Sequence, residues 1–153
     1  MDRSTAVQKY RRKGYGLKKK ILIDREILTL LAGESEEKNE IVGIIETNLQ
    51  NSADFFALSG DVWDIVAFVA KKHSLHGARK FLRLITSILA EMVETGSDMQ
   101  MLALQYAEEF QIDAESALTA VVAESLNVRE VISMNKSLDR IGGLNRINYK
   151  IKK

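Results

Sequence analysis

The stretch Ile21-Leu22-Ile23-Asp24-Arg25-Glu26-Ile27-Leu28 decides the fold of this chain. A short unbroken apolar run such as residues 21–23 is typical of a strand buried on both faces, as in a parallel sheet. A helical pattern follows at once and ends at Gly33. The stretch therefore predicts the opening strand and helix of an α/β domain, with Asp24 at the carboxyl end of the strand.

The rest of the chain continues this alternation of strands and helices. Short apolar runs predict further strands at 55–58 and 130–134, and the alternating pattern of 145–151 predicts a short edge strand. Apolar residues at helical spacing predict helices over 35–50, 74–95, 99–110 and 114–126. A further helix is expected after Ser59, which can cap it, with Val62, Ile65, Val66 and Val69 on one apolar stripe.

Strands separated by helices predict a three-layer α/β/α sandwich with a central, mainly parallel sheet. Functional sites in such sheets form beyond the carboxyl ends of the strands. The residues expected at that edge are Asp24, the turn from Ser59 to Asp64, and Asn135.

Composition restricts the class of protein. The chain has 153 residues, of which 46% are hydrophobic and 28% charged, as is usual for one globular domain. The absence of cysteine excludes disulfides and thiolate metal sites. No apolar run approaches the ~18 residues of a membrane span, and the basic N-terminal stretch lacks the apolar segment expected of a signal peptide. We expect a cytoplasmic protein without a membrane partner.

The charges are segregated along the sequence. The first twenty residues contain eight basic side chains and only Asp2 as an acid, whereas acids outnumber bases in the rest. We predict a basic arm over residues 1–18 and a globular domain over 19–153. Such an arm suits a nucleic-acid backbone, although a frayed terminus that binds nothing is the open alternative. The expected nucleic-acid contacts are Arg11, Arg12, Lys13, Lys18, Lys19 and Lys20.

Several other features of the sequence do not indicate a catalytic or binding site. No glycine-rich nucleotide loop is present. His73 and His76 are read as ordinary polar residues. Trp63 and Tyr106 are expected in or near the core and not as a stacking platform.

Three stretches together resemble the PIN domain family, and they span roughly residues 19–147. The first is the opening strand with Asp24. The second is residues 107–120, which resemble the family's two-helix signature with an aspartate before Ala-Leu. The third is residues 132–141, which are similar to the family's late strand and loop.

The resemblance implies a ribonuclease that uses Mg²⁺ or Mn²⁺. Carboxylates from separate strand ends meet in one pocket in this family, and hard divalent cations prefer such oxygen ligands. The ions activate water and stabilise the charge on the cleaved phosphodiester.

The first site position carries over as an acid, and the second is acidic only if Asp64 occupies it. Asp24 matches the family's first aspartate, with the alternative that it only caps the following helix. The second position falls on Asp64 or on Ile65, and the alignment leaves both open.

The later positions depart from the family. Ser116 stands where the resemblance implies an aspartate, and Asn135 stands at the late acidic position. Glu115 points about 100° away from Ser116 on a helix. The metal ligands expected from this carry-over are Asp24, Asp64, Glu115 and Asn135.

The leading hypothesis is therefore a PIN-like domain whose metal site is eroded. Its expected role is to bind RNA or a protein partner. The alternative is an active, toxin-type endoribonuclease held by an antitoxin, with Asp24, Asp64 and Glu115 in a variant site. A homodimer is a further expectation, because the helix predicted over 74–95 offers an apolar face.

Overall fold

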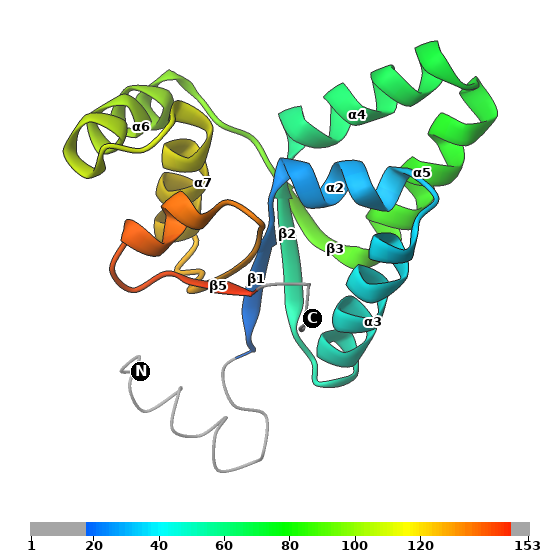
Figure 1. Cartoon of the computed structure of the whole chain (residues 1–153), viewed down its shortest axis with the longest axis horizontal. Helices are drawn as coiled ribbons and strands as arrows, with labels where there is room; N and C mark the ends of the chain where they lie inside the picture. Colours follow the sequence, from blue (N-terminus) through cyan, green and yellow to red (C-terminus); the bar gives the residue numbers. More distant parts are fainter. Residues whose placement is uncertain (1–17, 148–153) are drawn as a thin grey trace, which may run out of the picture.

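The computed structural model describes residues 18–147 of the chain (Figure 1). Its order of elements is β1 (Lys20–Ile23), α2 (Arg25–Ala32), α3 (Glu36–Gln50), β2 (Asp54–Leu58), α4 (Ser59–Lys72), α5 (Leu75–Ile88), β3 (Leu89–Val93), α6 (Ser97–Phe110), α7 (Ala114–Ser125), β4 (Glu130–Ile132), the 3-10 helix η1 (Lys136–Arg140) and β5 (Asn145–Ile147).

The five strands form one parallel sheet in the order β3-β2-β1-β4-β5. Strand β1 lies at its centre, where Leu22 pairs in register with Phe56 of β2 and Val131 of β4. The carboxyl end of every strand therefore faces the same edge. This confirms the predicted parallel sheet and places Asp24 at the middle of that edge.

Helices cover both faces of the sheet, which confirms the three-layer architecture (Figure 1). Ile21, Ile23 and Phe55 point to one face, where they pack under helices α2 to α5. Leu22 points to the other face and packs with Val131 and with helix α7. This alternation explains the unbroken apolar run of β1, because a strand covered on both faces buries every side chain.

The helix predicted over 74–95 was wrong after Ile88. Helix α5 ends at Ile88, and residues 89–93 form β3 at the open edge of β2. No proline or glycine marks this change before Gly96. Backbone hydrogen bonds to β2 override the helical spacing of the apolar residues, which is a tertiary effect that a local pattern does not contain.

The apolar face expected to serve a dimer is used inside the protomer. Ala78, Phe81 and Ile85 of α5 are buried in the core cluster beside α4 and the sheet. Dimerisation remains a prediction, but the apolar face of α5 no longer supports it.

Three smaller expectations need correction or restriction. Leu58, and not Ser59, is the N-cap of α4, and Ser59 is the first helical residue. Trp63 was expected in or near the core, but 63% of it is exposed on α4. Strand β5 confirms the edge strand at 145–147, while residues 148–151 lie outside the described part of the chain.

Most of the predicted arm, residues 1–17, also lies outside the described residues, with Arg11, Arg12 and Lys13 among them. No helix within residues 18–147 is long and apolar enough to span a bilayer.

Candidate functional site

Asp24 stands where β1 ends and α2 begins. Its Oδ1 accepts a hydrogen bond of 3.1 Å from the Ile27 amide, so it is the N-cap of α2. It is also 8% exposed and lines a pocket at the carboxyl edge of the sheet. Both sequence interpretations of Asp24 therefore describe its geometry. Burial raises the pKa of the Asp24 carboxyl, and a hydrogen bond from Ser133 opposes this shift.

Ser116 reaches the same pocket from the first turn of α7. Asp113 is the N-cap of this helix and accepts hydrogen bonds from both the amide of Ser116, at 3.0 Å, and its hydroxyl, at 2.6 Å. The cap thereby fixes the rotamer of Ser116, which is 3% exposed.

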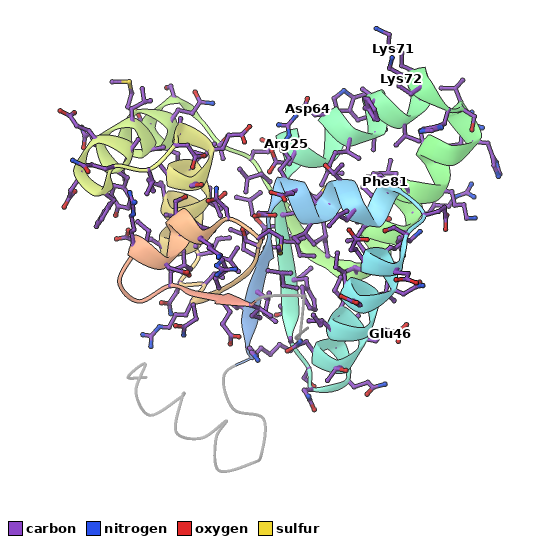
Figure 2. The ribbon with its side chains drawn as sticks, viewed as in Figure 1. Arg25, Glu46, Asp64, Lys71, Lys72 and Phe81 are labelled. Carbon is purple, nitrogen blue, oxygen red and sulfur yellow. The ribbon has the colours of Figure 1, made fainter. Side chains whose placement is uncertain are left out.

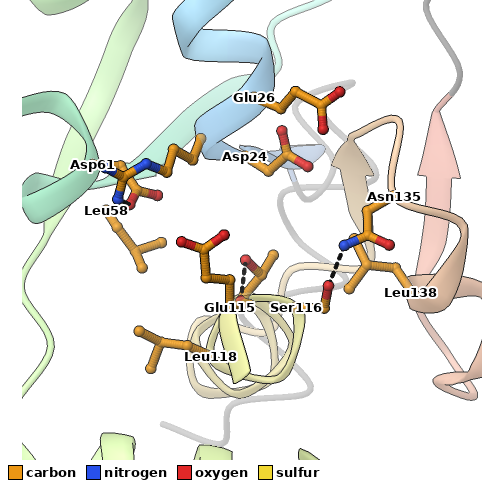
Figure 3. A pocket seen from close by; sticks show the side chains of 11 residues that line it. Asp24, Glu26, Leu58, Asp61, Glu115, Ser116, Leu118, Asn135 and Leu138 are labelled. Atoms are coloured by element: carbon orange, nitrogen blue, oxygen red, sulfur yellow. Dashed lines mark hydrogen bonds and ion pairs between the residues drawn. The ribbon is translucent and has the colours of Figure 1, made fainter. Parts of the chain in front are cut away.

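Asn135 comes to the pocket from the loop after β4. Its side-chain amide donates a hydrogen bond to the Ser116 hydroxyl (Figure 3). Ser137 donates to the Asn135 side-chain oxygen at 2.6 Å and lies 3.2 Å from the Ser116 hydroxyl. The two positions where the resemblance implies carboxylates thus hold neutral groups that bind each other.

Asp113 supplies the one formal charge of this hydrogen-bonded group. Burial acts to raise the pKa of Asp113, but hydrogen bonds from Ser116 and Asn135 together lower it below its usual value. Asp113 remains ionised at neutral pH as an acceptor at the base of the network.

The pocket joins these segments into one small cavity of about 90 Å³. It therefore brings together Asp24, Ser116 and Asn135, which are far apart in the sequence. Its complete lining is Asp24, Arg25, Glu26, Leu58, Asp61, Glu115, Ser116, Leu118, Thr119, Asn135 and Leu138.

The second acidic position in the pocket is Asp61, which the sequence reasoning missed. Ile65 is buried in the core cluster, and Asp64 does not line the pocket. Helical geometry contains a signal for this arrangement. Asp61 lies about 40° from the buried Ile65 around the helix axis, whereas Asp64 lies about 100° from it. Asp61 is thus nearer to the side of α4 that faces the sheet.

Arg25 brings a positive charge into this acidic group. Its guanidinium lies 3.5 Å from Asp61 and 3.0 Å from Asp64. Figure 3 shows the Glu115 carboxylate pointing towards the side of the pocket where Asp61 lies.

Asp61 nevertheless resists ionisation. Burial is the largest cause that raises the pKa of Asp61 to about 6; Arg25 opposes it, and the negative charges of Glu115, Asp24 and Asp64 add to it. Among residues 18–147, no three Asp, Glu or His side chains form a group that could hold a metal ion.

The described lysines of the basic segment lie at the opposite edge of the sheet. Lys18 pairs with Asp54 at 3.5 Å, and Lys19 pairs with Glu130 at 3.4 Å. Lys20 donates to the carbonyl oxygen of Leu126. Since these contacts surround the amino end of β1, the three lysines are separated from the pocket by the length of the strand.

Comparison with solved structures identifies the fold. The chain is similar to VapBC2 from Rickettsia felis, which was solved bound to a DNA fragment from the VapBC2 promoter. The TM-score is 0.66 and the sequence identity is 16%, over 84% of this chain and 98% of that chain. It is also similar to Mycobacterium tuberculosis VapC20, a toxin that cleaves the sarcin–ricin loop, with a TM-score of 0.58 and 9% identity over 80% and 95%. No family model matches the chain, and no curated protein matches it in sequence.

Proposed function

Because the chain has the PIN-domain fold, we propose that it is a PIN-like domain that has lost its metal-dependent nuclease site and acts by binding RNA or a protein partner. The hydrogen bond between Asn135 and Ser116 is the observation that carries this proposal. Two carboxylates at these positions would repel each other without a cation between them. An amide and a hydroxyl satisfy each other and need no cation.

Arg25 supports the same proposal. Its guanidinium supplies a fixed positive charge next to Asp61, so part of the pocket's negative charge is compensated by the protein itself. A divalent ion would have to compete with this charge and would find neutral oxygens at Ser116 and Asn135. Hard cations bind such a donor set weakly compared with three or four carboxylates. The residues present therefore do not fit Mg²⁺ or Mn²⁺ well.

An active endoribonuclease remains the second candidate, and one observation favours it. Four carboxyl groups line the pocket, from Asp24, Glu26, Asp61 and Glu115. A variant metal site would use Asp24, Asp61 and Glu115 in place of Asp24, Asp64 and Glu115, the combination expected from the sequence. In that case the chain would act as a toxin-type nuclease, and a protein antitoxin would be its natural partner.

Cleavage of single-stranded RNA with Mn²⁺ separates the two candidates. We expect no cleavage above a control without enzyme, even at high protein concentration, by the full-length chain with its fold verified by circular dichroism. Asp24→Asn provides the matched control. Cleavage by the wild-type chain that disappears in both Asp24→Asn and Glu115→Gln would instead establish the active nuclease.

A further inference from the structure

A stretch without acidic residues forms much of one side of the molecule. Residues 65–90 contain no Asp or Glu, and they build most of α4 and all of α5. Their basic side chains are all exposed, and within residues 18–147 no acid forms an ion pair with any of them. These side chains are Lys71, Lys72, Arg79, Lys80 and Arg83, accompanied by the exposed His73 and His76.

The charges on α5 gather on one side of the helix. His76, Arg79, Lys80 and Arg83 fall within an arc of about 100° around the axis. The buried Ala78, Phe81 and Ile85 occupy the opposite side. The helix is therefore held in the core by its apolar side and presents a continuous cationic stripe outwards.

An aromatic ring adjoins this stripe in a hollow between α4 and α5. Trp63, Lys71, Leu75 and Arg79 are among the residues that line the hollow, which has a volume of about 600 Å³. Trp63 is 63% exposed there. Figure 2 shows Lys71 and Lys72 at the end of α4 that is far from Arg25 and Asp64. The hollow thus combines an exposed aromatic side chain with two cations, and it shares no lining residue with the acidic pocket.

We propose that this α4–α5 surface, defined by Trp63, Lys71, Arg79, Lys80 and Arg83, binds single-stranded RNA. A base stacks on Trp63, and the cations of Lys71 and Arg79 contact the phosphates on either side. The stripe on α5 guides the following backbone. This inference rests on the binding role in the proposed function and assigns that role to a surface.

The charge of the surface favours RNA over a protein occupant. A protein would need to supply acids to many separate cations, in addition to covering the ring. A single-stranded RNA carries one phosphate for each nucleotide and a flat base that stacks without sequence preference. The acidic pocket repels phosphates, so a cationic surface remote from it is where a polyanion can approach.

Trp63 makes binding directly observable, because it is the only tryptophan of the chain. The probe is an unstructured RNA of about 20 nucleotides, longer than the ~4–16 nucleotides that single-strand binding folds cover. Titration in EDTA should quench the tryptophan fluorescence of the full-length protein in a saturable way. Unchanged fluorescence while labelled RNA binds would overturn the proposal, because RNA would then bind elsewhere.

Charge variants test the cations. We expect Lys71→Gln/Arg79→Gln/Arg83→Gln to bind labelled RNA about 100-fold more weakly than the wild type at ~0.1 M salt. Each lost phosphate contact reduces the slope of log affinity against log salt concentration by about 0.7. The matched control Arg129→Gln/Lys136→Gln/Arg140→Gln removes the same charge at three exposed cations outside this surface and should bind nearly as the wild type does. An equal loss in both triple variants, or a loss in the control alone, would overturn the assignment.

Variants of the ring separate RNA from a protein occupant. Trp63→Leu should weaken RNA binding roughly 5- to 150-fold, the range for one stacked base, and Trp63→Phe should retain most of the affinity. If Trp63→Leu leaves RNA affinity unchanged but converts a dimer to a monomer in sedimentation, the hollow is a contact between copies and the proposal is wrong. Because binding is measured in EDTA, RNA cleavage in Mn²⁺ would refute the lost nuclease without altering this result.

Discussion

Asp61 and Ser116 show how single residues change the chemistry of a pocket whose position the fold determines. Ser116 and Asn135 lie where carboxylates are implied, and Asn135 donates a hydrogen bond to Ser116 where two carboxylates would repel each other. Asp61 is a carboxyl group at the second position of the pocket, but its side chain is only 17% exposed and has other acids nearby. The ionised form of Asp61 is therefore costly despite the nearby Arg25.

This cost predicts how stability depends on pH. Below pH ~4 Asp61 is protonated in the folded and unfolded states, so its ionisation does not affect the free energy of unfolding. Above its folded pKa of about 6 it is ionised in both states, and the folded state bears the full penalty. Asp61→Asn should therefore increase the free energy of unfolding at pH 8 by about 1–3 kcal/mol, at ~1.4 kcal/mol for each unit of pKa shift, and change it little at pH 4.

Urea denaturation of the wild type and Asp61→Asn at both pH values measures this difference. Asp64→Asn is the matched control, because Asp64 has a similar partner in Arg25 but is 56% exposed at its side chain. A loss of stability in Asp61→Asn at pH 8 would mean that the Arg25 ion pair outweighs burial.

The site residues divide by how they can be predicted. Asp24 and Asn135 were expected at one edge because strand ends are visible in the sequence, and Ser116 was placed with them by the family resemblance. All three line one pocket. Asp61 was missed because its assignment depends on the rotation of α4, which is set by packing against the sheet. Trp63 was misplaced because hydrophobicity does not reveal whether an aromatic ring finds a neighbour to cover it.

At the scale of elements, the N-cap of α7 links helix stability to the pocket. Asp113 accepts hydrogen bonds from the amide and hydroxyl of Ser116 and receives weaker ones from Asn135 and Ser137. Asp113→Ala should cost about 1–3 kcal/mol of stability, from the lost cap and the unsatisfied Ser116 hydroxyl. Asp113→Asn retains a capping oxygen and should cost less than half as much.

Thermal denaturation of these variants tests the connection. Ser35→Ala removes the cap of α3, where Ser35 accepts from the Lys38 amide at 3.2 Å, far from the pocket. The account is contradicted if Asp113→Ala costs no more than Ser35→Ala, because Asp113 would then act as a cap alone.

The elements themselves followed from the sequence where local signals exist. Caps at Asp24, Ser35 and Asp113 mark the starts of three helices. Strand β3 has no such signal. Its extended conformation depends on backbone pairing with β2, whose paired residues lie 34 or 35 positions earlier in the chain. The local pattern alone therefore predicted a helix.

The whole molecule separates its charges into distinct regions. Carboxyl groups gather at the carboxyl edge of the sheet, and lysines paired with acids surround the amino end of β1. The cations at the end of α4 and along α5 form no ion pair within the part of the chain that the structure describes. Catalysis would require phosphates at the acidic edge and therefore a metal ion there. Binding without catalysis requires only the cationic surface, which is consistent with neutral residues at Ser116 and Asn135.

The central claim, that the pocket has lost its affinity for divalent cations, is tested most directly by calorimetric titration of the wild type and Ser116→Asp/Asn135→Asp with Mn²⁺. We predict no saturable binding to the wild type below ~1 mM, which corresponds to about −4 kcal/mol. The double variant restores two carboxylates beside Asp24 and should bind Mn²⁺ more tightly, with the gain removed by Asp24→Asn. Micromolar binding by the wild type that Asp24→Asn abolishes would contradict the account.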